Sequence, residues 1–383
     1  MIYCTVNEFN STFTYKKGRC KLAEIKNFDA VAALDAMDAH VDDWRDATKG
    51  KQRGIFSFDD VVNVKLKTLK KRIYTDIESL PAWKMKECIY KGVDDYEYLY
   101  DEWKELNVGD RWGNNGWSAF FKNSFDMPER FAGKKVTLNV YFGGDSLLSL
   151  NGEPYQGLDP FRNSVLLSEN AEAGKHYDVD IESYYVWHSN ESTVKTLSCS
   201  FIGVVDPVIE EVYWDFKAVF NALFMPVLDT GLAELIRSAL KEAFTHVNFD
   251  ASGDEFKAGL LEAQKVLKDR VYNNPNYKTE GTLALVGNSH LDIVFMWAYK
   301  EYIRKLGRTH ATMLRLMEQY PDFIFSQSTA PLTSKWKSVI PTSSSRLNSA
   351  LKRADGNTSA QCGLNPIVTL FRENPLFVSF FTA

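Results

Sequence analysis

The chain has 383 residues, of which 45% are hydrophobic and 25% charged, with a formal net charge of −5. This length allows two or three domains with ordinary apolar cores, and the acidic balance argues against nucleic acid or an anionic membrane as a partner. The five cysteines are scattered, and the sequence shows neither a signal-peptide pattern nor an apolar run of about 20 residues, so we expect no disulfide framework and a cytoplasmic location.

Residues 1–105 form a mixed segment of charged and aromatic residues to which we assign no chemistry. Basic residues cluster in it at Lys65, Lys67, Lys70, Lys71 and Arg72. Such a cluster could bind phosphate, but a solvated helix face is the favoured interpretation.

Residues 106–208 are predicted to form a β-sandwich of the jelly-roll kind. Val136, Leu138 and Val140 alternate with polar or aromatic residues, as in a strand with one buried face. Asn151-Gly152 stands between two apolar segments and predicts a type I′ hairpin turn. Several short strands at this spacing are typical of a sandwich.

Residues 209–278 are predicted to be a helical linker. From Asp229 to Tyr272 the apolar residues recur with the period of a helix, enough for two helices. Ser252 and Glu255 have the spacing of a capping box for the second helix. The turn-forming residues 273–281 then predict a domain boundary near 280.

Residues 279–332 are predicted to begin a parallel sheet or an α/β barrel. The apolar run Thr282 to Val286 predicts a strand buried on both faces, and a loop and a long helix follow it. The helical pattern ends at Pro321, and a strand resumes at Phe323. The whole chain is thus predicted to be multidomain: a sandwich, a helical bridge and the first β-α-β of a truncated barrel.

His290 and Asp292 follow the first predicted strand of this barrel, where barrel active sites lie. Their spacing lets an imidazole and a carboxylate project to the same side of an extended turn, which suits zinc but also manganese, cobalt or iron. By spacing alone, a surface hydrogen-bonded pair is the more common interpretation.

The segment from Thr282 to Gln327 resembles the start of the catalytic domain of glycoside hydrolase family 38 α-mannosidases. Those enzymes carry G-H-x-H-x-D, an aromatic W-L-W, E-x-x-R-K, R-T, L-M-E-x-Y-P and F-x-x-S-Q in order. The matching positions are Gly287, His290, Asp292, Phe295, Trp297, Glu301, Arg304, Lys305, Arg308, Thr309, Leu316, Met317, Glu318, Tyr320, Pro321, Phe323, Ser326 and Gln327.

The resemblance implies that His290 and Asp292 are two of four zinc ligands and that Phe295 stacks on the mannose ring. Asn288 replaces the first His of the motif, which is not an implied ligand. The basic residues that follow are interpreted as helix-surface or supporting charges rather than catalytic groups; they are Arg304, Lys305 and Arg308.

The preceding region resembles the N-terminal sandwich of the cytosolic branch of these mannosidases, through Trp117-x-x-Phe-Phe-Lys and the stretch 143–162. Trp117, Asp159 and Arg162 could bind sugar, although packing or domain contact is the favoured role for residues of an appended sandwich.

A retaining glycosidase needs two carboxyl groups about 5–5.5 Å apart, and the family's nucleophile motif W-x-E-P-D is not visible here. Residues 333–383 hold six basic and two acidic side chains and little periodicity. A disordered tail is the simplest explanation. Our sharper hypothesis is an out-of-frame translation that begins near Pro331 to Thr333, because synonymous codons after Arg353 permit W-V-E-P-D in another frame.

The resemblance therefore implies a zinc-dependent, retaining α-mannosidase that acts on mannose-containing oligosaccharides, with a homo-oligomer compatible with the full-length enzyme. The 383-residue chain itself is predicted to be inactive. The alternatives are a noncatalytic carbohydrate-binding or oligomerisation module built on the sandwich, and an unstable fragment with unpaired strand edges.

Overall fold

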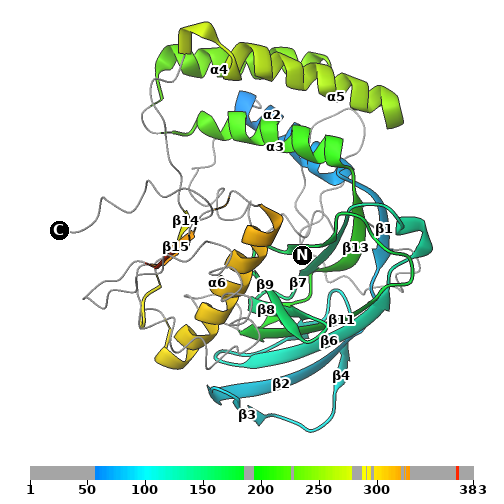
Figure 1. Ribbon diagram of the computed structural model, residues 1–383, viewed down its shortest axis with the longest axis vertical. Coiled ribbons are helices and arrows are strands. Elements are labelled where there is room, and N and C mark those ends of the chain that lie inside the picture. The colour runs from blue at the N-terminus through cyan, green and yellow to red at the C-terminus, as the bar shows by residue number, and fades with distance from the viewer. Residues whose placement is uncertain are drawn as a thin grey trace, which may run out of the picture.

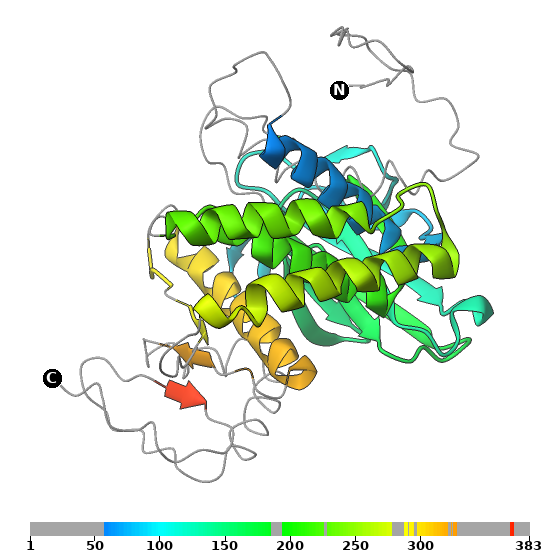
Figure 2. The same cartoon turned by 90° about the horizontal axis from the view of Figure 1, so that it is seen from above.

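The computed structural model describes residues 57–184, 194–225, 228–277, 287–289, 291–294, 297–320, 323, 325–327 and 368–370. Two antiparallel sheets, a layer of helices at one end of them and a long helix across the second sheet make up this part of the chain (Figures 1 and 2). None of the described helices is long and apolar enough to cross a membrane.

The first sheet of the sandwich has four antiparallel strands. In spatial order they are β1 (Tyr74–Ser79), β13 (Cys199–Val205), β7 (Val136–Tyr141) and β10 (Ser164–Ser168).

The second sheet is larger, and all its strand pairs are also antiparallel. Its spatial order is β3 (Asp95–Tyr98), β2 (Trp83–Gly92), β6 (Ser118–Asp126), β11 (His176–Tyr184), β8 (Asp145–Leu150) and β9 (Glu153–Leu158), with β4 (Lys104–Leu106) beside β2. A separate short pair joins β5 (Arg111–Trp112) and β12 (Lys195–Thr196).

One apolar core fills the space between the two sheets. Trp83, Phe121 and Phe142 are fully buried in it, and the last two rings stack with their centroids 3.9 Å apart. This core confirms the predicted sandwich, but the sheets begin at Tyr74, earlier than the predicted boundary at 106. The early strands were missed because parts of both faces of β2 are buried, which removes the alternation that marks a half-buried strand.

The hairpin between β8 and β9 is confirmed. Asn151 and Gly152 have φ values of 50° and 80°, the left-handed conformation that a type I′ turn requires at both positions. By contrast, the prediction of a single buried face for Val136–Tyr141 is wrong, because all six residues are buried. Tyr141 packs with Cys199 and Phe201 on the face of the first sheet that points away from the sandwich core.

Four helices with a shared apolar core form the layer at the end of the sandwich. They are α2 (Phe58–Arg72), α3 (Pro207–Ala222), α4 (Thr230–Thr245) and α5 (Gly253–Leu267). The last two confirm the pair of helices predicted between Asp229 and Tyr272.

The ends of these helices correct two predictions. The Ser252 side chain makes no capping bond to α5, so the predicted capping box is wrong. The Glu255 carboxylate instead accepts from the side-chain amide of Asn248 at 3.5 Å. The basic cluster on α2 is also not wholly solvated. Arg72 donates to the carbonyl of Ala251 at 2.7 Å, and its guanidinium lies 4.3 Å from the ring centroid of Phe256.

A β-α-β unit follows the helical layer. It contains β14 (Gly287–Asn288), α6 (Tyr299–Gln319) and β15 (Phe325–Gln327), and the two strands pair in parallel. This order agrees with the predicted start of a parallel sheet, although Thr282 to Val286 lie outside the described residues. A third strand, β16 (Val368–Leu370), pairs with β15 in the antiparallel direction, whereas the strands of an α/β barrel are parallel. The barrel is therefore not confirmed.

Candidate functional site

The loop between β14 and α6 carries the one predicted metal ligand that the structure describes, Asp292. Because β14 and β15 are parallel, this loop begins at the edge where both strands have their carboxyl ends, which is where α/β folds place their ligands. Asp292 is half-buried, and the indole nitrogen of Trp297 donates to its backbone carbonyl at 3.2 Å. His290 and Phe295 lie outside the described residues.

A buried ion-pair network begins on the first turn of α6, directly after this loop. Glu301 is only 1% exposed, and its carboxylate binds two arginines of the same helix. Arg304 Nε donates to Oε2 at 2.7 Å, and Arg308 Nη2 donates to Oε1 at 2.5 Å. The spacing of three and seven residues places all three side chains on one face of the helix.

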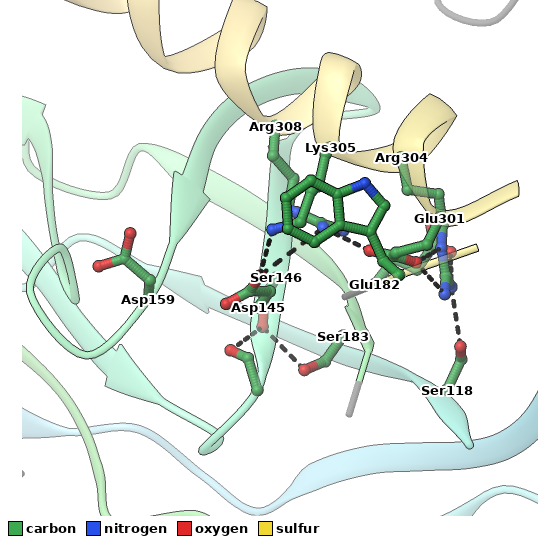
Figure 3. Close-up of polar contacts among 12 residues, drawn as sticks. Ser118, Asp145, Ser146, Asp159, Glu182, Ser183, Glu301, Arg304, Lys305 and Arg308 are labelled. Atoms are coloured by element: carbon green, nitrogen blue, oxygen red, sulfur yellow. Dashed lines mark hydrogen bonds and ion pairs between the residues drawn. The ribbon is translucent and has the colours of Figure 1, made fainter. Parts of the chain in front are cut away.

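Arg304 carries the network into the second sheet of the sandwich (Figure 3). Its Nη1 donates to the Ser118 hydroxyl at 2.7 Å and to Glu182 Oε1 at 3.0 Å. Its guanidinium carbon also lies 4.0 Å from the ring centroid of Tyr90 and 4.4 Å from that of Tyr184. Ion pairs and stacked rings together compensate a buried cation for the loss of water.

The electrostatics of this cluster favour its charged form. Burial works against the charge of Arg304, but the carboxylates of Glu301 and Glu182 outweigh it and raise the pKa of Arg304 above its usual value. Burial raises the pKa of the neighbouring Tyr90 to about 12, so its phenol stays neutral at pH 7. The buried guanidinium of Arg304 is thus held in its charged form beside a phenol that stays neutral.

A second set of contacts ties α6 to β8. Lys305 Nζ lies 3.1 Å from Asp145 Oδ2, and Arg308 Nη2 lies 3.8 Å from the same oxygen (Figure 3). The Lys305 ammonium is also 4.5 Å from the ring centroid of Trp297, the residue that holds the carbonyl of Asp292. Lys305 therefore connects the sandwich to the candidate ligand loop.

Close backbone approach completes the contact at the middle of α6. The amide of Gly157 on β9 donates to the Thr312 hydroxyl at 2.9 Å. A side chain on Gly157 would meet the carbonyl oxygen of Arg308 and the Thr312 hydroxyl at 3.1 Å. Only glycine lets the helix and the strand come this close without displacement.

These contacts revise the interpretation of the basic residues on α6. Arg304 and Arg308 are each 8% exposed, so the helix-surface alternative is wrong for them, and the alternative of supporting charges remains. Lys305 is 21% exposed at its side chain and bridges two parts of the molecule. The signal that could have revealed this is the regular recurrence of Glu301, Arg304 and Arg308 on one helical stripe, since an acid enclosed by two bases suits burial better than isolated charges do.

Asp159 and Arg162, considered earlier as sugar-binding residues, stabilise a local turn instead. The Asp159 carboxylate accepts from the backbone amides of Phe161 and Arg162 at 2.8 and 2.9 Å and pairs with the Arg162 guanidinium. In Figure 3 this carboxylate lies apart from the contacts around Arg304. These bonds give both side chains a local structural role, and the packing or domain-contact role stays a prediction.

The donor chemistry of Asp292 fits a divalent metal, but the described residues do not complete a site. No group of three or more His, Cys, Asp or Glu side chains that could hold a metal occurs in the part of the chain that the structure describes.

Two family profiles match the chain. Residues 77–218 match the α-mannosidase jelly roll domain, and residues 280–355 match the glycosyl hydrolases family 38 N-terminal domain. The first match covers both sheets of the sandwich almost entirely, and the second contains β14, α6 and β15. The second match also extends past the predicted frame junction near Pro331 to Thr333.

The curated relatives and the solved structures align with different shares of the chain. Alpha-mannosidase 2C1 of Mus musculus is 27% identical over 254 residues, which are 63% of this chain and 24% of that protein. Alpha-mannosidase G of Dictyostelium discoideum is 22% identical over 265 residues, which are 63% of this chain and 23% of that protein. A β-glucuronidase structure from Ruminococcus gnavus aligns with 34% of this chain and 30% of its own at 12% identity, with a TM-score of 0.25.

The chain spans about a quarter of the length of the curated relatives it matches. The two profile matches fall on the two parts of the molecule that the ion-pair network joins, the sandwich and α6.

Proposed function

We propose that this chain, which carries the jelly roll and the N-terminal catalytic-domain segment of a glycoside hydrolase family 38 α-mannosidase, serves the hydrolysis of terminal α-mannosides. The proposed reaction is a zinc-assisted double displacement with retention, on mannose-containing oligosaccharides in the cytoplasm. The observation that carries it is the position of the family motif. Its residues from Asp292 to Arg308 lie on the loop and helix that pack on the matched jelly roll.

In this proposal the residues after β14 bind the metal and the sugar. Asp292 supplies a carboxylate ligand and His290 an imidazole ligand, and Phe295 offers a flat apolar face on which a mannose ring can stack. Zinc, when bound, would supply a Lewis-acidic centre for the hydroxyls of the sugar. The position of Asp292 at the carboxyl ends of two parallel strands supports this assignment.

The 383-residue chain alone is proposed to be inactive. A retaining glycosidase needs a nucleophile and an acid/base about 5–5.5 Å apart. The family's W-x-E-P-D motif is not present in this sequence. Where the proposed shifted frame would encode the nucleophilic Asp of that motif, the chain has Pro366 and Ile367. Neither side chain can attack a sugar or bind a metal.

Zinc binding tests the proposed site without relying on activity. Competition with a chelating dye is expected to detect weak zinc binding by the full chain, because it carries two of the four implied ligands. This binding is expected to be lost in His290→Gln and in Asp292→Asn. Asp159→Asn is the matched control, because it alters a half-buried carboxylate that is engaged in its own turn. Absence of zinc on the parent chain, or zinc retained in both ligand variants, would exclude the site.

An activity assay on the same samples tests the proposed inactivity. Hydrolysis of an aryl α-mannoside by the pure chain, abolished by His290→Ala, would contradict it. Resequencing the DNA from the codon for Gln327 onward tests the reading-frame hypothesis separately. A shifted base near Pro331 followed by an open W-V-E-P-D frame would support the hypothesis, and codons incompatible with that motif would reject it.

A second function, noncatalytic carbohydrate binding by the sandwich, has one observation in its favour. Tyr98 and Trp103 are 47% and 41% exposed, although Lys86 and Lys122 already lie 4.4 and 5.4 Å from their ring centroids. It ranks second because α6 covers much of the second sheet's outer face, and a sugar would compete with Lys86 and Lys122 for the rings of Tyr98 and Trp103. Calorimetric titration with mannobiose discriminates: binding lost in Trp103→Ala but kept in His290→Ala would favour it.

A further inference from the structure

An unbroken series of side-chain contacts runs from the sandwich to the backbone of the loop that carries Asp292. It starts at the Asp145 carboxylate on β8, which lies 3.1 Å from Lys305 Nζ. The same ammonium lies 4.5 Å from the centroid of the Trp297 ring, and the Trp297 indole donates to the carbonyl of Asp292 at 3.2 Å. The residues of the series lie on a strand, a helix and a loop.

We infer that Lys305 and Trp297 are positioning residues, through which the jelly roll fixes the loop of the candidate metal ligand Asp292. The inference rests on the proposed function for the role of Asp292. Neither residue is assigned to touch zinc or sugar, since Trp297 contacts the backbone of Asp292 and Lys305 contacts Trp297.

The chemistry of the series makes its contacts mutually supporting. A cation near the face of an indole is attracted by the electrons of the ring and polarises it, which makes the N–H a stronger donor to the carbonyl of Asp292. Asp145 in turn holds the ammonium in place, and the Lys305 side chain is only 21% exposed, so solvent screens this pair less than a surface pair. A metal ligand held in this way keeps its orientation before metal binds, which favours affinity.

The neighbouring Lys300 shows that the arrangement is specific to one lysine. Lys300 is on the same helix and also reaches the sandwich, where its ammonium donates to the carbonyl of Tyr90 at 2.6 Å. The Lys300 ammonium lies 6.0 Å from the ring centroid of Tyr90, whereas it is Lys305 that lies over the Trp297 ring. Lys300 is therefore a matched control: its loss weakens the attachment of α6 to the sandwich but leaves the series through Trp297 intact.

The test is a nuclear magnetic resonance measurement on the full chain with ¹⁵N-labelled tryptophan. The sequence has nine tryptophans, and Trp297→Phe identifies the indole signal of Trp297 by its disappearance. In Lys305→Met this signal is expected to shift and its exchange with solvent to accelerate about fivefold, the factor that corresponds to one hydrogen bond of about 1 kcal/mol. Asp145→Asn, as a second variant, should act in the same direction, and Lys300→Met should leave the signal unchanged.

Zinc affinity of the same proteins separates this inference from the proposed function. Lys305→Met and Trp297→Phe are expected to weaken zinc binding about tenfold, and Lys300→Met to leave it unchanged. A Trp297 signal unaffected by Lys305→Met, or equally affected by Lys300→Met, would overturn the positioning role whatever the metal does. If the indole responds as expected but the parent chain binds no zinc, the contact series stands, while the proposed metal site and the role of the series in serving it both fail.

Discussion

The two faces of the second sheet are packed by opposite chemistry. Its inner face contributes Trp83 and Phe121 to a core of apolar side chains, whereas its outer face meets α6 through Glu182 and Asp145. Apolar packing is non-directional, so it selects the arrangement of two layers through shape complementarity alone. A buried ion-pair network is favourable only when every partner is in place, and therefore selects one orientation of the helix.

This difference matters because α6 follows the loop of Asp292. A helix that could slide or rotate on an apolar surface would move that loop with it, while the paired arginines Arg304 and Arg308 hold it in one register on the sheet. The sandwich core thus stabilises its own domain, and the charged contact orients the neighbouring one.

Loss of the central carboxylate should have the largest effect on this contact. Glu301→Gln keeps the side-chain size but leaves Arg304 and Arg308 without their shared anion, and we expect it to cost about 3–5 kcal/mol of the free energy of unfolding in urea. The control is Glu318→Gln on the same helix, which removes the partner of Arg315 at 3.4 Å near the helix end and should cost about 1 kcal/mol or less. Equal costs for the two variants would show that the buried network does not govern the attachment of α6.

A smaller effect is expected where the strand and helix backbones approach. Gly157→Ala places a methyl group 3.1 Å from the Arg308 carbonyl and should cost about 1–3 kcal/mol, as overpacking does. Gly92→Ala is the matched control in the same sheet, because nothing lies within 4 Å of its added methyl group. Urea unfolding of both variants measures the difference, and a Gly157→Ala chain as stable as Gly92→Ala would refute the close contact.

The smallest effect concerns the buried histidine of α6. Burial lowers the pKa of His310 below its usual value of 6.5, so the folded chain keeps the imidazole neutral where the unfolded chain would bind a proton. The stability contribution of the neutral His310 is therefore fully present above pH 6.5. It is lost as the pH falls from 6.5 toward the lowered folded-state pKa. His310→Gln should therefore flatten the loss of stability on the acid side, measured by urea unfolding between pH 7 and 5.

His176 offers a control of opposite sign. Hydrogen bonds to Asp126 and Asp178 raise its pKa, so its contribution is present below the unfolded value and fades as the pH rises through the folded one. His176→Gln should not flatten the acid-side loss, and an identical response of the two variants would contradict the assignment to burial.

The sequence by itself determined the elements whose physics is local. The Asn151-Gly152 turn, the two helices after Asp229 and the order strand, helix, strand around α6 could all be predicted, because turn chemistry and apolar periodicity act between residues near in the chain. The motif around Asp292 could be recognised because its residues lie close together in the sequence.

Only the tertiary structure decided which residues pack against each helix and strand. Strand β2 carries Cys88 and Tyr90 on a face that α6 covers, so its burial could not be read as a simple alternation. Arg304 carries the same charge whether it faces water or Ser118 and Glu182, and periodicity cannot distinguish these surroundings. Ser118 and Glu182 lie more than a hundred positions from Arg304 in the sequence, and their arrangement in space turns an apparent helix surface into the contact that orients the candidate site.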